Sequence, residues 1–324
     1  MIERVCVVGG GAIGSLFAAY LAREVDVSVL TRREEHAAAL NEHGLRVTGR
    51  GDFTSRVVAA TTADALPEPD VVIVATKGTQ LAGALGGFRG QWPEALVVTV
   101  QNGLGAERIV RRAGNWPIVS GVTFMSGNRR SDTHVEYFLD TETWLGPYDD
   151  TPYERVQELA ALIASTGLKA RAFEDLAPAQ WSKLVFNATV NSVAALTGLR
   201  HDSHFAALDA PGDLGHHVRA LMDEGKAVAA AAGVELHEDP WEMNVHATRR
   251  GSPHYPSMLE DVDARRPTEI ELITGSLVRE AERLGVPVPL HTAMYRLVKA
   301  REASYAYDEV YEEATPPSHE RSTA

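Results

Sequence analysis

Three polar side chains recur at four-residue intervals in an otherwise apolar stretch of the chain, WSKLVFNATVNSVAALTG. Lys183, Asn187 and Asn191 would share one stripe of an α-helix, because residues i and i+4 lie on the same face. A buried ammonium or amide without a hydrogen-bonding partner costs about 2 kcal/mol or more. The stripe is therefore either the solvent-facing side of an amphipathic helix or a set of groups that bind one ligand, and this stretch alone leaves both open.

A glycine-rich turn follows the first apolar run of the chain, RVCVV. Gly9, Gly11 and Gly14 form the pattern G-x-G-x-x-G before an Ala- and Leu-rich helical pattern. In a βαβ unit the first glycine allows a tight turn, the second lets the backbone approach a pyrophosphate, and the third lets the helix pack close to the strand. We therefore predict that these glycines, with Ala12 and Ile13, bind a dinucleotide at the helix N-terminus.

The residues after the second predicted strand, DVSVLTRREE, bear on which nicotinamide cofactor binds. An acidic side chain there favours the ribose 2′-hydroxyl of NAD, whereas a cation favours the 2′-phosphate of NADP. A guanidinium can hold phosphate through two hydrogen bonds. We predict NADP(H), with Arg32 as the main 2′-phosphate ligand and Arg33 either stacking on the adenine or lying in solvent. Glu34 and Glu35 weaken this preference.

Two later apolar runs, DVVIVATK at 70–77 and ALVVTVQNG at 95–103, are typical of central parallel strands that helices cover on both faces. Ligands of such sheets bind beyond the carboxyl ends of the strands. Lys77 and Asn102 stand at these ends, so we expect them near the cofactor's ribose or nicotinamide, or near the substrate. The simpler alternative is a loop lysine and a turn asparagine.

Length and composition are those of a two-domain α/β protein, since 324 residues and 44% hydrophobic content predict about two packed domains. We predict a Rossmann-type dinucleotide-binding domain over 1–176, which includes antiparallel strands between 118 and 146. From 177 to 310 the pattern is helical throughout, which predicts an all-α second domain that holds the substrate. The polar stretch 311–324 is expected to be a disordered tail.

The formal net charge of −13 argues against nucleic acid as a partner. The sequence has no run of eighteen apolar residues and no leader with a cleavage site, so we expect a cytoplasmic protein without a membrane span. Cys6, the single cysteine, lies in the first strand pattern, where a buried and inert thiol is expected. The stretch GKAVAAAAG could pack against a second copy in a homodimer or within its own domain.

The segment HYPSMLEDVDARRPTEIELITG carries two further polar candidates. Ser257 precedes an apolar pair. Glu269 is predicted to open a long amphipathic helix, where the helix dipole favours an acidic residue. Taken alone, Glu269 could be an ordinary first-turn carboxylate.

Two polar segments, 200–204 and 246–254, add histidines and arginines. His201 and His204 form an H-x₂-H pair without a third ligand at a defined spacing, so we expect solvent-exposed histidines and no metal site. Arg249 and Arg250 could instead add positive charge that suits an acidic substrate.

Together the motifs resemble the ketopantoate reductase (2-dehydropantoate 2-reductase) family. They are the glycine-rich start, the arginine after the second strand, the strand-end lysine, QNG, W-x-K-x₃-N-x₃-N, S-M-L-x-D and R-x-T-E-I, in the family's order from Val5 to about Lys299. The resemblance implies a Rossmann domain, a helical domain and a cleft between them. It also implies NADPH-dependent reduction of 2-dehydropantoate to pantoate, on the route to pantothenate and coenzyme A.

The resemblance assigns roles to the candidates as well. Lys183 matches the general acid that protonates the carbonyl oxygen as hydride arrives, which suits a developing alkoxide. Glu269 matches the residue that accepts a hydrogen bond from the substrate's hydroxyl group. The remaining matches are substrate-binding residues and residues that line the cofactor and the floor of the site: Asn187, Asn191, Ser257, Lys77 and Asn102.

Two alternatives remain open. The polar segments near the substrate side could indicate an NADP-dependent reductase of a different 2-oxo acid, in which Lys183 still acts as the acid. A non-catalytic NADP(H)-binding regulator would have lost the motifs of the second domain. Because all five candidates of that domain are present, we prefer an enzyme.

Overall fold

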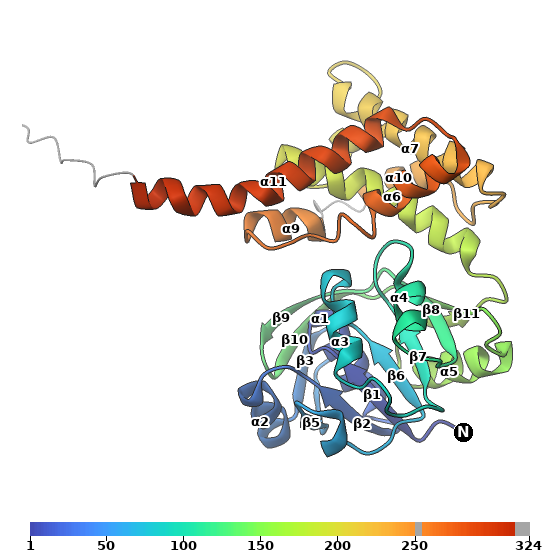
Figure 1. Ribbon diagram of the computed structural model, residues 1–324, viewed down its shortest axis with the longest axis vertical. Helices are drawn as coiled ribbons and strands as arrows, with labels where there is room; N and C mark the ends of the chain where they lie inside the picture. Colours follow the sequence, from blue (N-terminus) through green and yellow to red (C-terminus); the bar gives the residue numbers. More distant parts are fainter. Residues whose placement is uncertain (250–254, 315–324) are drawn as a thin grey trace, which may run out of the picture. The chain divides into compact units, whose positions relative to one another are not determined.

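The computed structural model describes residues 1–249 and 255–314 (Figure 1). The chain forms two compact units, residues 1–184 with 234–238, and residues 185–233 with the described residues from 239 onward. Residues 250–254 of the polar segment, which include Arg250, and residues 315–324 of the expected tail lie outside the described residues.

The first unit is built on an eight-stranded sheet. Its strands are Arg4–Val8 (β1), Asp26–Leu30 (β2), Val58–Ala60 (β5), Val71–Val74 (β6), Leu96–Thr99 (β7), Ile118–Thr123 (β8), Thr143–Tyr148 (β11) and Ala170–Ala172 (β12). They lie in the order β12-β11-β8-β7-β6-β1-β2-β5, and all neighbours are parallel except β8 and β11. The continuous apolar runs of β6 and β7 are buried along their whole length, as the sequence predicts.

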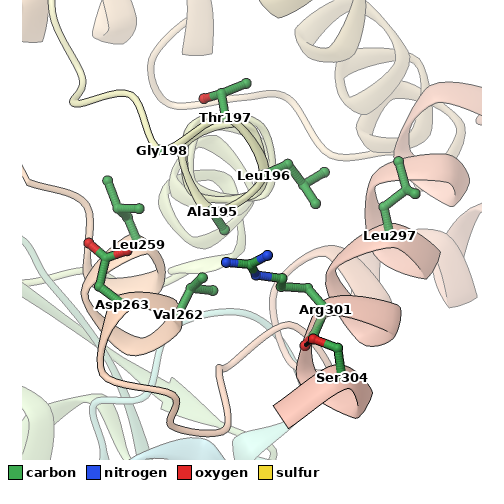
Figure 2. Close-up of a pocket in the computed structure, with 10 residues that line it drawn as sticks. All are labelled: Ala195, Leu196, Thr197, Gly198, Leu259, Val262, Asp263, Leu297, Arg301 and Ser304. Carbon is green, nitrogen blue, oxygen red and sulfur yellow. Dashed lines mark hydrogen bonds between the residues drawn. The ribbon is translucent and has the colours of Figure 1, made fainter. Parts of the chain in front are cut away.

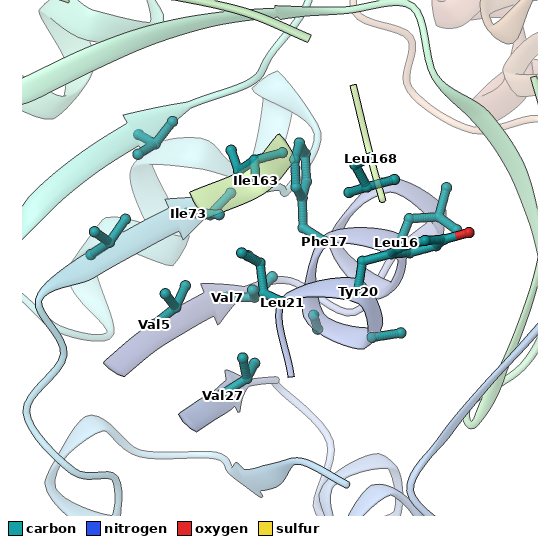
Figure 3. Close-up of a cluster of buried hydrophobic side chains, with 14 of the residues drawn as sticks. Val5, Val7, Leu16, Phe17, Tyr20, Leu21, Val27, Ile73, Ile163 and Leu168 are labelled. Atoms are coloured by element: carbon teal, nitrogen blue, oxygen red, sulfur yellow. The ribbon is translucent and has the colours of Figure 1, made fainter. Parts of the chain in front are cut away.

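Helices cover both faces of this sheet. They are Ala12–Leu21 (α1), Glu34–His43 (α2), Leu81–Gly86 (α3), Ala106–Ala113 (α4) and Tyr153–Ser165 (α5), with short 3₁₀ helices at Ala63–Ala65 (η1) and Gly78–Gln80 (η2). Successive side chains of a strand point to opposite faces, so Val5 and Val7 enter the core against α1, which Figure 3 shows. Cys6 and Val8 enter the core on the other face. This two-sided burial confirms the expected α/β domain.

A second, four-stranded sheet belongs to the same unit. Its strands are Leu45–Gly49 (β3), Phe53–Ser55 (β4), Ser126–Ser131 (β9) and His134–Leu139 (β10), in the order β4-β3-β10-β9. Helix α1 packs against β9 and β10. Antiparallel strands between 118 and 146 are thus present, but they are divided between two sheets, since β9 pairs with β10 and β8 pairs with β11.

The described residues from 177 onward are helical and include no strand, which confirms the all-α prediction. The helices are Ala177–Thr197 (α6), Asp213–Ala231 (α7), Pro240–Thr248 (α8), Ser257–Asp263 (α9), Thr274–Leu284 (α10) and Pro289–Ala314 (α11), with a 3₁₀ turn at Ser203–Phe205 (η3). Helix α11 therefore includes 311–314, which we had expected in the tail. Among the described residues no helix is both long and apolar enough to cross a membrane.

The Ala-rich stretch of α7 packs within its own unit. A Cβ atom at Gly225 would lie 2.6 Å from Val185 Cγ1, so this glycine lets α7 approach α6 closely. Val228 and Ala229 of the same stretch are fully buried. Packing inside the unit therefore accounts for Gly225, Val228 and Ala229, while Ala227, Ala230 and Ala231 of the same stretch are exposed.

Candidate active site

The glycine-rich turn has the geometry that a dinucleotide requires. Gly9 has a φ of +106°, and a Cβ atom there would lie 2.8 Å from Thr76 Cγ2. A Cβ atom at Gly14 would lie 2.0 Å from the carbonyl oxygen of Gly9, so only glycine lets α1 pack this close to the turn. A Cβ atom at Gly11 would have no described atom within 4 Å, which leaves open space where a pyrophosphate would approach.

Helix α1 begins directly after this turn, with Gly11 as its N-cap and Ala12 and Ile13 in its first turn. Gly11 has no side chain that could cap the helix, and the first N–H groups of a helix have no partner within the helix. These groups and the helix dipole can bind a phosphate. The residues present therefore fit a dinucleotide cofactor.

Two further candidates follow neighbouring parallel strands at the same edge of the sheet. Lys77 lies three residues beyond the end of β6, and Asn102 lies three beyond the end of β7. Both are partly buried. Gln101, which the sequence analysis did not single out, donates from Nε2 to the carbonyl oxygens of Val74 (2.7 Å) and Thr76 (2.9 Å) and so joins the two strand ends.

Arg32 is exposed just beyond β2, as a ligand for a 2′-phosphate would be. Arg33 instead forms an ion pair with Asp132, in the turn between β9 and β10, while its side chain is 51% exposed. This hydrogen bond from Arg33 holds the pKa of the Asp132 carboxyl below its usual range. Arg33 is thus half exposed, with its guanidinium paired to the small sheet.

Lys183 lies in α6 and is 7% exposed. Its ammonium donates a hydrogen bond to the carbonyl oxygen of Thr123 at the end of β8, and Nζ lies 4.9 Å from the centre of the Phe124 ring. The Thr123 hydroxyl in turn accepts from Thr143 Oγ1 at 3.0 Å, which ties β8 to β11 beside the lysine. A carbonyl oxygen and an aromatic face both stabilise the positive charge of an ammonium.

The two asparagines of α6 are also buried, with Asn187 9% and Asn191 6% exposed. The stripe is therefore not a solvent-facing side of an amphipathic helix. Asn191 Oδ1 accepts a hydrogen bond from the backbone N–H of Met258 at 3.3 Å, which places the start of α9 beside this helix. Ser257, the first residue of α9, is exposed next to that contact.

Glu269 does not open a helix, because α10 begins only at Thr274. Ile273 N–H donates to the Glu269 carbonyl oxygen at 3.0 Å, four residues back, as in an α-helix. Gly275 N–H instead donates to the Ile270 carbonyl oxygen, five residues back. The turn that starts at Glu269 is therefore out of register with α10. Thr274 Oγ1 donates to the Ala188 carbonyl of α6 at 3.3 Å. The partly buried Glu269 thus belongs to a turn whose end is fixed to the helix of the two asparagines.

The histidines of the 200–204 segment differ from each other. His204 is exposed, as expected, but His201 is only 2% exposed, so that expectation was wrong. His201 Nε2 shares a hydrogen bond of 2.8 Å with Asn244 Oδ1, and its ring packs edge-on against Phe186 and Phe205. This histidine is part of the core of the helical unit.

The helical unit also contains a cavity of about 540 Å³ at the end of α6, beside α9 and α11. Figure 2 shows Asp263 and Arg301 among its lining side chains, with Leu259 and Leu297. None of the residues that line it is a predicted site residue.

Comparison with known proteins identifies the family. The model described as "Ketopantoate reductase PanE/ApbA" matches residues 5–150, and "Ketopantoate reductase PanE/ApbA C terminal" matches residues 175–302. The 2-dehydropantoate 2-reductase of Streptococcus pyogenes serotype M1 is 31% identical over 304 residues, which cover 92% of this chain and 98% of that protein.

Solved structures agree with this result. The 2-dehydropantoate 2-reductase from Methylococcus capsulatus is 31% identical with a TM-score of 0.81, over 93% of this chain and 97% of that one. A D-mandelate dehydrogenase, solved with NADH and anilino(oxo)acetate, shares the fold with a TM-score of 0.83 at 24% identity, over 93% and 99% of the two chains. The chain belongs to the ketopantoate reductase family and is an oxidoreductase that acts on CH–OH groups.

Proposed function

We propose that this protein catalyses the NADPH-dependent reduction of 2-dehydropantoate to pantoate, a step toward pantothenate and coenzyme A. The name shared by the curated relatives supports the substrate. The observation that carries the proposal is the buried polar stripe of α6, because Lys183, Asn187 and Asn191 are desolvated on a helix that is otherwise almost wholly buried. The hydrogen bonds of Lys183 and Asn191 offset part of the cost of burying them and hold both groups in fixed positions, where a 2-oxo acid could bind.

The cofactor, when bound, supplies the hydride for the 2-oxo group. Lys183 then donates a proton to the carbonyl oxygen, on which negative charge develops. The Thr123 carbonyl and the Phe124 ring hold the ammonium in one place before the transfer. A fixed proton donor needs little reorganisation during the reaction, which favours the transition state.

The remaining candidates would orient the substrate. Asn187 and Asn191 offer amide groups that bind carboxylate and hydroxyl oxygens without adding charge, and Ser257 offers a hydroxyl. Glu269 would accept a hydrogen bond from the substrate's hydroxyl group. The contact between Asn191 Oδ1 and Met258 N–H supports this grouping, since it fixes the amide plane next to Ser257.

On the cofactor side, Arg32, Lys77 and Asn102 are proposed to bind NADPH with the glycine-rich turn. The exposed guanidinium of Arg32 at the end of β2 supports a 2′-phosphate ligand. A cytoplasmic location and a homodimer are further proposals. Cell fractionation would test the location, and light scattering after size exclusion would test the oligomeric state.

The decisive experiment follows NADPH oxidation by the purified protein with ketopantoate and a panel of other 2-oxo acids. Highest kcat/KM with ketopantoate supports the proposal. Turnover only with another 2-oxo acid would keep the chemistry and change the substrate. No turnover with any member, despite tight NADPH binding, would instead support a non-catalytic regulator.

A second candidate function is the reduction of a different 2-oxo acid. The similarity in fold to a D-mandelate dehydrogenase solved with anilino(oxo)acetate favours including aryl 2-oxo acids in the panel.

A further inference from the structure

A pair of arginines meets at one carboxylate beside the glycine-rich turn. Asp132 forms ion pairs with Arg33, which follows β2, and with Arg129 of β9, whose Nη1 lies 3.1 Å from Oδ1. The same Nη1 donates to the carbonyl oxygen of Gly10 at 3.4 Å. A guanidinium of the small sheet therefore reaches the turn that we propose binds the cofactor.

The base of this cluster is rigid. A Cβ atom at Gly10 would lie 2.3 Å from His36 Cε1, so the turn rests directly on this imidazole ring. His36 is 3% exposed, and its Nδ1 shares a hydrogen bond of 3.0 Å with Thr31 Oγ1 at the end of β2. Because Thr31 precedes Arg32 in the chain, His36 fixes the strand end that carries Arg32 relative to Gly10.

The charges of the cluster suit a dianion. Burial lowers the pKa of His36, so this ring is neutral at pH 7 and the charge comes from the arginines. Asp132 and Glu35, which also attracts Arg33, offset two of the three guanidiniums of Arg32, Arg33 and Arg129, so the cluster keeps a net positive charge. The side chains of Arg129 and Arg33 are 38% and 51% exposed and so remain accessible to a ligand. A phosphate monoester carries a charge of about −1.5 to −2 at pH 7.

We propose that Arg129 is a second specificity residue for the 2′-phosphate of NADPH, held in place by Asp132 and by the Gly10 carbonyl. This inference rests on the proposed NADPH preference. Arg32, two residues beyond β2, and Arg129 of β9 would approach the phosphate from different sheets. NADH lacks this phosphate, so its affinity does not depend on Arg129.

The test compares Arg129→Gln with Arg130→Gln in the full-length protein. Arg130 is the next residue of β9, and because side chains alternate along a strand it serves as a matched control. Its guanidinium pairs with Glu136 of β10 rather than with Asp132. The readout is the Kd of NADPH and of NADH from nicotinamide fluorescence, which requires no turnover.

For Arg129→Gln we expect the Kd of NADPH to rise about tenfold or more, with the Kd of NADH changed less than about twofold. Arg130→Gln should leave both values unchanged, and Arg129→Lys should retain part of the preference. Equal loss for both cofactors would overturn the inference, since Arg129 would then act on the turn itself. An unchanged NADPH affinity would overturn it too.

The same titration separates this inference from the proposed function. If the wild-type protein binds NADH as tightly as NADPH, the proposed cofactor is wrong and Arg129 has no specificity role. If the wild type prefers NADPH and Arg129→Gln keeps the full preference, only the role of Arg129 fails.

Discussion

At the scale of single residues, the surroundings of Lys183 suit the general acid that we propose. Its Nζ donates a hydrogen bond to a backbone carbonyl oxygen, which is too weak a base to take the proton from the ammonium. The Phe124 face adds attraction for the cation without a competing base. When a substrate oxygen gains negative charge, the ammonium can transfer its proton there.

Replacing Lys183 with alanine tests this role directly. General acid catalysis contributes about 10²–10⁴-fold, so Lys183→Ala should lower kcat with ketopantoate by about a hundredfold or more. The Kd of NADPH, from nicotinamide fluorescence, should change little because the proposed role of the lysine is to donate a proton to the substrate and not to hold the cofactor. A variant with near-native kcat would remove Lys183 from the mechanism.

Arg32→Ala is the corresponding prediction for the cofactor. If Arg32 binds the 2′-phosphate as proposed, its removal costs charge-assisted hydrogen bonds and should raise the KM for NADPH by about tenfold or more. The KM for NADH should stay the same, because NADH has only a hydroxyl group at this position. An equal rise for both would show that Arg32 has a structural role.

At the scale of elements, one buried carboxylate links three segments of the first unit. Glu107, in the first turn of α4, is 6% exposed. It accepts hydrogen bonds from Ser120 Oγ of β8 at 2.7 Å and from Gln180 Nε2 of α6 at 3.0 Å. Gln180 lies one turn before Lys183, so this carboxylate helps to fix the start of α6.

Glu107→Ala should therefore destabilise the protein. The change leaves two donors without their partner, and an unsatisfied buried polar group costs about 1–3 kcal/mol. The free energy of unfolding from urea titration measures the effect. Arg108→Ala, at the neighbouring position of α4, is the comparison variant. If Glu107→Ala unfolds at the same urea concentration as the wild type, the carboxylate does not link these segments.

The elements also show what local sequence can and cannot reveal. The strands β1, β6 and β7 were predictable because a continuous β-branched run between turn residues has few other structures. The start of α10 was not, since a bond from Gly275 N–H to Ile270 O shifts the register of the preceding turn. The short strands β3 and β4 were not predicted either, because no local pattern marks them. Strand β3 is extended through its pairing with β10, which lies far along the chain.

The candidate site also combines features that the local sequence reveals with contacts that it does not. The four-residue spacing on α6 and the glycine pattern are local, so the sequence revealed them. The partners of Lys183 are not local, because Thr123 lies sixty residues earlier in the chain. The ion pair of Arg33 with Asp132 spans ninety-nine residues and depends on the small sheet. Contacts of this kind follow from the tertiary fold and not from any pattern around one residue.

At the scale of the whole molecule, acid stability depends on groups buried in both units. Glu224 of α7 accepts from the N–H groups of Leu290 and His291 at the start of α11, and His291 Nδ1 lies 3.1 Å from its Oε2. These bonds outweigh burial and hold the pKa of Glu224 below its usual 4.5. Burial holds the pKa of His291 below its usual 6.5.

Both pKa shifts make the folded state less stable as the pH falls. A histidine with a lowered pKa in the fold binds fewer protons than in the unfolded chain, so stability falls as the pH drops below about 6.5. The lowered pKa of Glu224 causes a further loss below about 4.5. We expect the melting temperature to decline from pH 7 to pH 5 and more steeply below pH 4.5.

His291→Leu is the variant that tests this account. It removes one of the groups that must stay neutral, so the decline between pH 6.5 and pH 5 should become shallower than in the wild type. His36, whose pKa is also lowered by burial, would maintain the remaining slope. An unchanged slope would show that His291 is not a source of the pH dependence.

The single cysteine gives the molecule one more property. Cys6 is fully buried in β1, and burial raises the pKa of its thiol to about 11. At neutral pH almost none of it is thiolate, the form that reacts with maleimides. The native thiol should therefore react little with maleimide labels, so that a label would attach mainly to an introduced cysteine. A cysteine introduced on each unit could carry a fluorophore or spin label, and distances between the labels would report motion during turnover.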